Sequence, residues 1–134
     1  MAWLSKYQPY LLSILRIVAG LLFLEHGMQK ILHFPPMPAA MAAGIPAKFM
    51  PVIMAAGIIE LVGGALITVG LFTQLAAFIC AGEMAVAYWM VHFQRGGFFP
   101  ANNGGDGAIL FCFIFLFLAA AGPGPLAISR SENI

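Results

Sequence analysis

Charged residues are scarce in this sequence: lysine and arginine together number 6, and aspartate and glutamate 5, among 134 residues. They make up 8% of the chain, whereas soluble domains contain about a quarter. A water-exposed surface cannot be built from this composition. With a formal net charge of +1 and no basic run, the chain also lacks the surface that nucleic-acid binding requires. At 62% hydrophobic residues, it is expected to be a single membrane-embedded domain spanning residues 1–134.

Cysteine is also scarce, since Cys80 and Cys112 are the only two in the sequence. Their spacing matches no CxxC or Cys/His metal motif, and there is no glycine-rich dinucleotide motif or cysteine set for an iron–sulfur cluster. We therefore expect no metal and no intrinsic cofactor. The two thiols are expected more than about 10 Å apart along the membrane normal, so a disulfide between them is not expected.

Long apolar runs occupy most of the sequence. A membrane-spanning helix needs about 20 mainly apolar residues. Four segments approach that length, the last being the shortest: residues 10–32, 51–70, 74–93 and 106–121. Pro51 suits the first turn of its helix, and Thr73 is expected to cap the next one. Short connections make the last three spans antiparallel neighbours. The predicted fold class is therefore all-α, an integral membrane up-down-up-down four-helix bundle, and no cleavable signal peptide is expected.

Proline and glycine punctuate these spans. The connection over residues 33–50 contains several prolines, which argue against a further span, although its Ala-Met stretch predicts a brief interfacial helix. Small residues let helices approach closely in lipid. We expect this role for the glycines of the second span: Gly57, Gly63, Gly64 and Gly70.

Four ionisable side chains are expected inside the membrane. We call side A the membrane face that holds both termini, and side B the opposite face. Helical rise places Arg16 about 9 Å inside side A and Glu25 in the side-B half of its span. Glu60 and Glu83 fall close to the midplane. Because a charge at the bilayer centre costs about 3 kcal/mol, such groups usually face the bundle interior and mark a site or a proton path. The alternative is that Arg16 pairs with Glu60 or Glu83 merely to hold the bundle together.

A further polar group is expected near side B. His26 and Lys30 are four residues apart and share a helix face, whereas Glu25 projects about 100° away from His26. One of Glu25 and His26 is therefore expected to contact a neighbouring helix or a second subunit. The third span ends, and the fourth begins, with polar residues on this same side. We predict a functional pocket here, with a solvated rim as the alternative, formed by His26, Lys30, His92, Asn103 and Asp106.

Five stretches occur in the order and spacing of a known family: RIVAGLLFLEHGMQK (16–30), GIP (44–46), ELVGGALITVGLFTQLAA (60–77), NNGGDGAILF (102–111) and GPGPLAIS (122–129). In these stretches the chain resembles the DoxX family of small bacterial membrane proteins. Two positions depart from the family pattern, since Asp106 replaces a glutamate and Arg130 replaces a terminal acid. The positions that the resemblance implies are Arg16, His26, Gly27, Lys30, Glu60, Gly64, Asn103 and Asp106.

The resemblance implies an association with membrane oxidoreductase complexes, and the first hypothesis is a quinone-interacting subunit of such a system. The side-B pocket would hydrogen-bond a quinone, and Glu60 and Glu83 would carry protons inward; histidine suits this role because its ordinary pKa lies near neutrality. The alternatives are a non-catalytic accessory or assembly subunit, or a small proton-coupled transporter. No catalytic residue is assigned. The expected partners are the lipid bilayer and either a redox-complex protein or a second copy of the chain, in the bacterial inner membrane.

Overall fold

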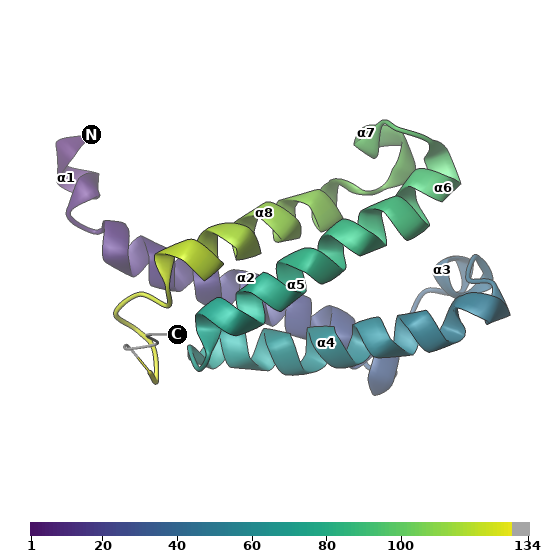
Figure 1. Ribbon diagram of the computed structural model, residues 1–134, viewed down its shortest axis with the longest axis horizontal. Coiled ribbons are helices and arrows are strands. Elements are labelled where there is room, and N and C mark those ends of the chain that lie inside the picture. The colour runs from purple at the N-terminus through teal and green to yellow at the C-terminus, as the bar shows by residue number, and fades with distance from the viewer. Residues whose placement is uncertain (130–134) are drawn as a thin grey trace.

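The computed structural model describes residues 1–129, and its helices form the predicted all-α membrane bundle. The long helices are α2 (Gln8–Ile31), α4 (Met50–Val69), α5 (Thr73–Ala87) and α8 (Asp106–Ala121). α5 continues through a π-helical turn, η2 (Tyr88–His92), into α6 (Phe93–Gly96). Successive long helices run in opposite directions, so the N-terminus and the segment after α8 lie at the same end, which is side A (Figure 1).

Three helical stretches are long and apolar enough to cross a membrane, namely Gln8–Ile31, Ala47–Val69 and Thr73–Gly96. α8 has 16 residues and is correspondingly shorter. At 1.5 Å per residue it measures about 24 Å, less than the roughly 30 Å of a hydrocarbon core. The sequence indicated that this span would be the shortest, and the structure agrees.

Short helices connect the long ones. α1 (Ala2–Ser5) precedes α2 at side A. Between α2 and α4, the proline-rich connection forms α3 (Ala39–Ala43) and the 3₁₀ turn η1 (Ala47–Phe49), which confirms the predicted brief helix. α7 (Pro100–Asn103) lies in the loop before α8. Both connections lie at the side-B end of the molecule (Figure 1).

The long helices pack as two close pairs, α2 with α4 and α5 with α8. Glycines allow the first pair to approach. A Cβ atom on Gly27 would lie 2.3 Å from the backbone nitrogen of Leu61, and one on Gly64 would lie 2.6 Å from that of Leu24. Because the obstacle in both cases is backbone, any larger residue would push the helices apart. The predicted role in helix packing is confirmed for Gly57, Gly63 and Gly64. Gly70 instead ends α4 and lies against the segment after α8.

Aromatic and small side chains join the two pairs. Phe23 of α2 contacts Phe111 and Phe115 of α8, with ring centroids 5.4 and 4.8 Å apart. On the other side of the core, the Cys80 sulfur lies directly against Gly63. Both cysteines of the chain are free thiols. α4 and α5 meet at a tight turn on side A and diverge toward side B, so the two pairs are open at that end (Figure 1).

The turn between α4 and α5 corrects one prediction. Thr73 does not cap α5, because Phe72 occupies the cap position with a φ of 49° and no side-chain cap bond. Thr73 is instead the first residue of the helix, and its hydroxyl is buried without a hydrogen-bond partner within residues 1–129. Gly70 ends α4 with a φ of 75°, a conformation that favours glycine. Backbone geometry, rather than a side-chain cap, therefore starts α5.

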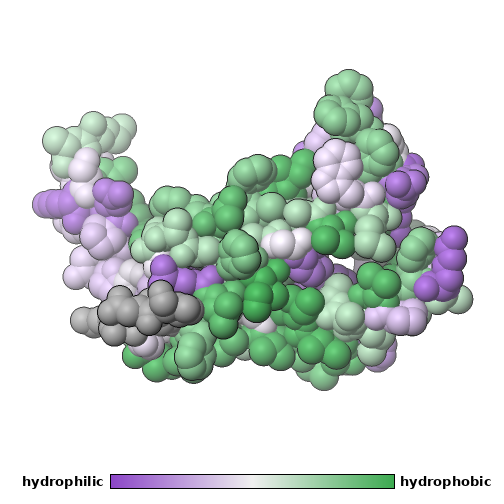
Figure 2. Space-filling view, viewed as in Figure 1, coloured by the Kyte–Doolittle hydropathy of each residue, from purple (hydrophilic) through white to green (hydrophobic). Residues whose placement is uncertain are grey.

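The outer surface is apolar along the length of the bundle (Figure 2). Each long helix exposes large hydrophobic side chains, for example Val18, Ile58, Phe78 and Phe113. A soluble monomer rarely exposes a continuous apolar surface of this extent, whereas lipid tails cover it without cost. Hydrophilic residues gather at the two ends of the molecule and in a recess between the helix pairs (Figure 2).

Candidate functional site

Arg16 is fully buried near side A, where its guanidinium meets only backbone carbonyl groups. Nη1 donates to the carbonyls of Ile67 and Thr68, each at 2.6 Å, at the end of α4. Nε donates to Pro123 at 2.8 Å, and Nη2 donates to Leu126. The predicted alternative, a pairing of Arg16 with Glu60 or Glu83, is therefore wrong. Unsatisfied carbonyls at the end of a helix and in an irregular segment offered better acceptors than an acid two or more turns away.

The segment that follows α8 is held in place by this arginine and by backbone hydrogen bonds. The backbone nitrogen of Ile128 donates to Val69 at 3.1 Å, and that of Ser129 donates to Gly70 at 3.0 Å. The Ser13 hydroxyl accepts a further bond from the backbone of Leu126. Residues 122–129 thus close side A of the bundle. Arg130, which stands at the position of the family's terminal acid, lies outside the described residues.

A partly buried ion pair joins the two helices of the first pair. The Lys30 ammonium, on the last turn of α2, lies 2.5 Å from Oε1 of Glu60 in the middle of α4. Glu60 is 2% exposed. Gly57 lies one turn from Glu60 on α4, and its backbone packs against the Lys30 side chain. Because Gly57 has no side chain of its own, the lysine can pass it and reach the acid. The pair thus links a residue expected in the side-B pocket to one expected on the proton path.

Glu83 of α5 completes a three-member charge cluster, which we call the Lys30–Glu60–Glu83 cluster. It lies within electrostatic reach of both Glu60 and Lys30. Oε2 of Glu60 and Oε2 of Glu83 are buried, and neither finds a hydrogen-bond partner within the described residues. A buried polar atom without a partner costs about 1 to 3 kcal/mol. Such an atom can be satisfied by an ordered water, by a group that donates to it or by a bound ligand.

Two members of the predicted side-B pocket, His92 and Asn103, lie together. Nδ1 of His92 donates to the Asn103 carbonyl at 3.2 Å. The buried Asn103 side chain donates to the Gly97 carbonyl and the Tyr88 hydroxyl, and it accepts a bond from the backbone of Gly105. These bonds fold the loop between α6 and α8 back onto η2. The Asn103 side chain is therefore engaged by its own loop and by Tyr88.

The other pocket candidates lie further out. His26 and Glu25 are both exposed on α2, and the His26 ring meets the edge of Phe111 with centroids 6.1 Å apart. His26 is thus the one that contacts a neighbouring helix. Asp106 is exposed at the first turn of α8, where a carboxylate complements the positive end of the helix dipole. Within residues 1–129, no hydrogen bond or ion pair joins His26 or Asp106 to His92, Asn103 or Lys30.

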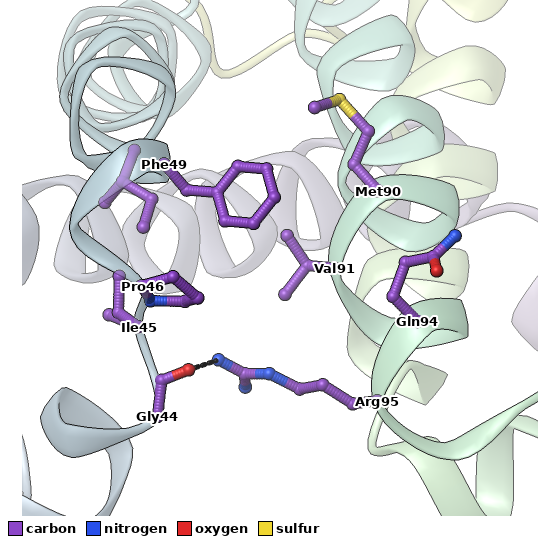
Figure 3. Close-up of a pocket in the computed structure, with 9 residues that line it drawn as sticks. Gly44, Ile45, Pro46, Phe49, Met90, Val91, Gln94 and Arg95 are labelled. Atoms are coloured by element: carbon purple, nitrogen blue, oxygen red, sulfur yellow. Dashed lines mark hydrogen bonds between the residues drawn. The ribbon is translucent and has the colours of Figure 1, made fainter.

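A cleft that sequence reasoning missed opens at side B between the diverging helix pairs (Figure 3). Its volume is about 230 Å³. Arg95 of α6 reaches across it and donates to the Gly44 carbonyl at 3.4 Å, a contact between segments 51 residues apart. The stretch GIP (44–46) lines one wall, but nothing in the sequence shows that it faces residues 90–95, so the cleft could not be predicted. The residues that line this side-B cleft are Gly44, Ile45, Pro46, Phe49, Ile53, Met90, Val91, Gln94 and Arg95.

The described residues contain no group of three or more histidine, cysteine, aspartate or glutamate side chains placed to hold a metal ion. The helices expose apolar side chains on the outside and enclose an ion pair between them. These features define a small multi-pass membrane protein with polar groups inside its bundle. The chain belongs to the DoxX family, whose model matches residues 11–93. An uncharacterized protein of Haemophilus influenzae is 46% identical over 110 residues, covering 81% of this chain and 80% of that protein. No solved structure matches.

The family match bears on the two candidate regions differently. It includes the residues of the Lys30–Glu60–Glu83 cluster and Arg16, and it ends before Asn103 and Asp106. The end of α7 and the start of α8, where those two residues lie, are therefore outside the matched segment. All three residues of the charge cluster lie within the segment that matches the family, and they also lie close together in the structure.

Proposed function

We propose that this DoxX protein is a quinone-interacting subunit of a membrane oxidoreductase system, located in the bacterial inner membrane. The observation that carries the proposal is the Lys30–Glu60–Glu83 cluster, with two buried carboxylate oxygens that lack partners. Ionisable groups inside a membrane mark proton relays and ligand sites, since their burial is costly. The family resemblance supports the choice of a quinone as the ligand.

The residues of the cluster suit the proton half of quinone chemistry. Oxidation of a quinol to a quinone releases two protons and two electrons. In the proposal, Glu60 and Glu83 accept the protons, while Lys30 holds the charge of the acid beside it. The electrons pass to a redox centre on a partner protein, because the sequence has no motif for binding one itself. This chain then contributes the site and the proton path, and the partner contributes electron transfer.

Quinone binding by the purified chain tests this function directly. Trp89 lies on η2 at side B, so quenching of its fluorescence by a short-chain quinone provides the signal. We expect saturable binding to the native chain and at least about tenfold weaker binding to Glu60→Gln and Glu83→Gln, the loss of roughly one charge-assisted hydrogen bond. Glu25→Gln is the matched control, because Glu25 is an exposed acid on the lipid-facing side of α2.

Equal binding by all four proteins would contradict the proposal. So would the absence of any quinone among the lipids extracted with the chain from its native membrane. These two measurements are independent, since the second does not depend on fluorescence or on an added analogue.

A second candidate function is proton-coupled transport of a small solute. The same unpartnered oxygens favour it, because acids at mid-depth are typical of proton-driven transporters. Chain reconstituted into liposomes without quinone would then move protons across the bilayer, and Glu83→Gln would abolish the flux. A flux that persists in Glu83→Gln, or no flux at all, would exclude this candidate.

A further inference from the structure

We propose that the side-B cleft binds one anionic phospholipid, with its phosphate between Arg95 and Lys48 and the start of its acyl chains against the apolar walls. This inference is independent of the proposed function, because the cleft lies apart from the Lys30–Glu60–Glu83 cluster and shares no residue with it.

The walls of the cleft are apolar and come from both helix pairs. Ile45, Pro46 and Phe49 line it from the connection before α4, while Met90 and Val91 line it from η2 (Figure 3). Acyl chains fit such a surface, which is continuous with the lipid-facing exterior. π-helical turns such as η2 occur frequently at functional sites, so the wall that this turn forms is a second pointer to a binding role.

One cation, Arg95, lines the cleft, and a second, Lys48, lies beside the lining residue Phe49; neither has an acid as its partner. Arg95 donates only to the uncharged Gly44 carbonyl, at 3.4 Å, and the Lys48 ammonium lies 5.1 Å from the ring of Phe49, a lining residue. Within residues 1–129 the ion pair of Lys30 with Glu60 is the sole salt bridge, so neither Arg95 nor Lys48 has a carboxylate partner. An arginine fork with a free face matches the oxygens of a phosphate. Both side chains are exposed at side B, so their charges are complementary to an anion that enters the cleft.

The depth of the cleft favours a lipid over other anions. Arg95 lies in the last turn of the stretch Thr73–Gly96, and Lys48 lies in the first turn of Ala47–Val69, so both stand at the side-B ends of their spans, at the level of the headgroups. Basic residues at this level attract anionic lipids by about 1 kcal/mol each. A neutral quinone head would leave both cations uncompensated, so it fits this cleft less well than it fits the charge cluster.

Native mass spectrometry of the purified full chain tests the proposal. The protein is titrated with phosphatidylglycerol and with phosphatidylcholine that carries the same acyl chains. We expect phosphatidylglycerol to bind more tightly, and Arg95→Gln and Lys48→Gln each to weaken it about fivefold. Lys6→Gln is the matched control, because the Lys6 ammonium lies over the Tyr7 ring at 5.0 Å on side A, a similar arrangement far from the cleft.

A variant that fills the cleft separates binding from general surface charge. Val91→Phe keeps both cations but occupies the apolar floor, so it should weaken phosphatidylglycerol binding while leaving the melting temperature of the lipid-free protein unchanged. Full binding by Val91→Phe, or an equal loss in Lys6→Gln, would overturn the proposal.

Competition with two other ligands tests whether the cleft binds a soluble phosphate or a quinone in place of a phospholipid. Glycerol 3-phosphate carries the headgroup charge without acyl chains, and a short-chain quinone carries a ring without charge. Neither should displace phosphatidylglycerol at equimolar concentration. Displacement by glycerol 3-phosphate would make the cleft a soluble-phosphate site, and displacement by the quinone would make it a quinone site; either result would overturn a phospholipid site. Failure of the proposed quinone function would leave these outcomes unaffected.

Discussion

Arg16 and Lys30 are both cations on α2, about four turns apart, and their surroundings differ in kind. Arg16 is fully buried and donates hydrogen bonds to backbone carbonyls of α4 and of the segment after α8. The Lys30 side chain is 23% exposed and meets a single oxygen of a carboxylate. Arg16 therefore has no titratable partner. Lys30 has one, the Glu60 carboxylate, whose second oxygen lacks a hydrogen-bond partner within the described residues.

The difference shows that depth in the membrane does not by itself identify a functional charge. The acceptors around Arg16 are fixed by the backbone and can neither move nor exchange a proton, so this cation closes side A of the bundle. The acceptors around Lys30 are carboxylates that can gain or lose a proton. The chemistry of the partners therefore indicates a structural role for Arg16 and supports the proposed site at Lys30.

Replacing Arg16 should have the largest effect on stability. Arg16→Met leaves carbonyl groups without a donor at the end of α4 and releases the segment after α8. The substitution removes four hydrogen bonds from the guanidinium, and even two of them at about 1.5 kcal/mol each give a loss of at least about 3 kcal/mol. The free energy of unfolding in mixed detergent micelles provides the measurement. Lys6→Met is the control, since Lys6 is exposed and makes no hydrogen bond within residues 1–129. If Arg16→Met lowers the free energy of unfolding by less than about 1 kcal/mol, Arg16 does not have the structural role that distinguishes it from Lys30.

Separating α2 from α4 should have the next largest effect. Gly27→Ala sets a methyl group 2.3 Å from the backbone nitrogen of Leu61, so the helices must shift, at a cost of about 3 kcal/mol. Because Lys30 lies on the following turn, the shift should also weaken quinone binding. Gly82→Ala is the matched control, since no atom lies within 4 Å of its added methyl group. Similar stability in the two variants would show that the pair is less tightly packed than these contacts indicate.

Breaking the ion pair should have a smaller effect that depends on how it is broken. Lys30→Met leaves the Glu60 carboxylate buried without its cation, which should cost about 2 kcal/mol because Lys30 is only partly buried. The double variant Lys30→Met/Glu60→Leu removes both charges and should recover most of that loss. Neither variant should bind quinone. If the double variant is as unstable as the single one, the pair holds the helices together and its role is structural, as for Arg16.

The composition and the four apolar runs were enough to predict the fold. A chain that is 62% hydrophobic has few alternatives to membrane helices. The brief helix after α2 and the packing role of the span-two glycines were also visible in the sequence. Thr73 was misjudged as a cap, because cap preference is local and the turn that precedes α5 is set by the left-handed conformation of Phe72.

The candidate site was predictable only in part. Glu60 and Glu83 stood out as acids in apolar runs, but their relation to Lys30 depends on the close approach of α2 to α4. For Arg16 the sequence offered a place on a proton path or, as the alternative, a pairing with an acid. It did not indicate the backbone carbonyls, because acceptors supplied by distant segments leave no sign in a sequence. The side-B cleft arises where two pairs of helices diverge, and helix periodicity does not determine that angle.

Replacing Thr73 should have the smallest effect, and it tests whether an unpartnered buried oxygen by itself marks a functional site. Its hydroxyl, like the oxygens of Glu60 and Glu83, is buried without a partner within the described residues, but it carries no charge. Thr73→Val replaces the hydroxyl with a methyl group of similar shape, and it should leave stability within about 1 kcal/mol and quinone binding unchanged.

Thr68→Val is the matched control for this substitution, because the Thr68 hydroxyl donates to the Gly64 carbonyl at 2.7 Å and its loss should cost about 1 kcal/mol. If Thr73→Val proves the more destabilising of the two, the Thr73 hydroxyl is held by a buried water. An unpartnered oxygen would then no longer suffice to mark a ligand site, and the assignment of the Lys30–Glu60–Glu83 cluster would rest on its charges alone.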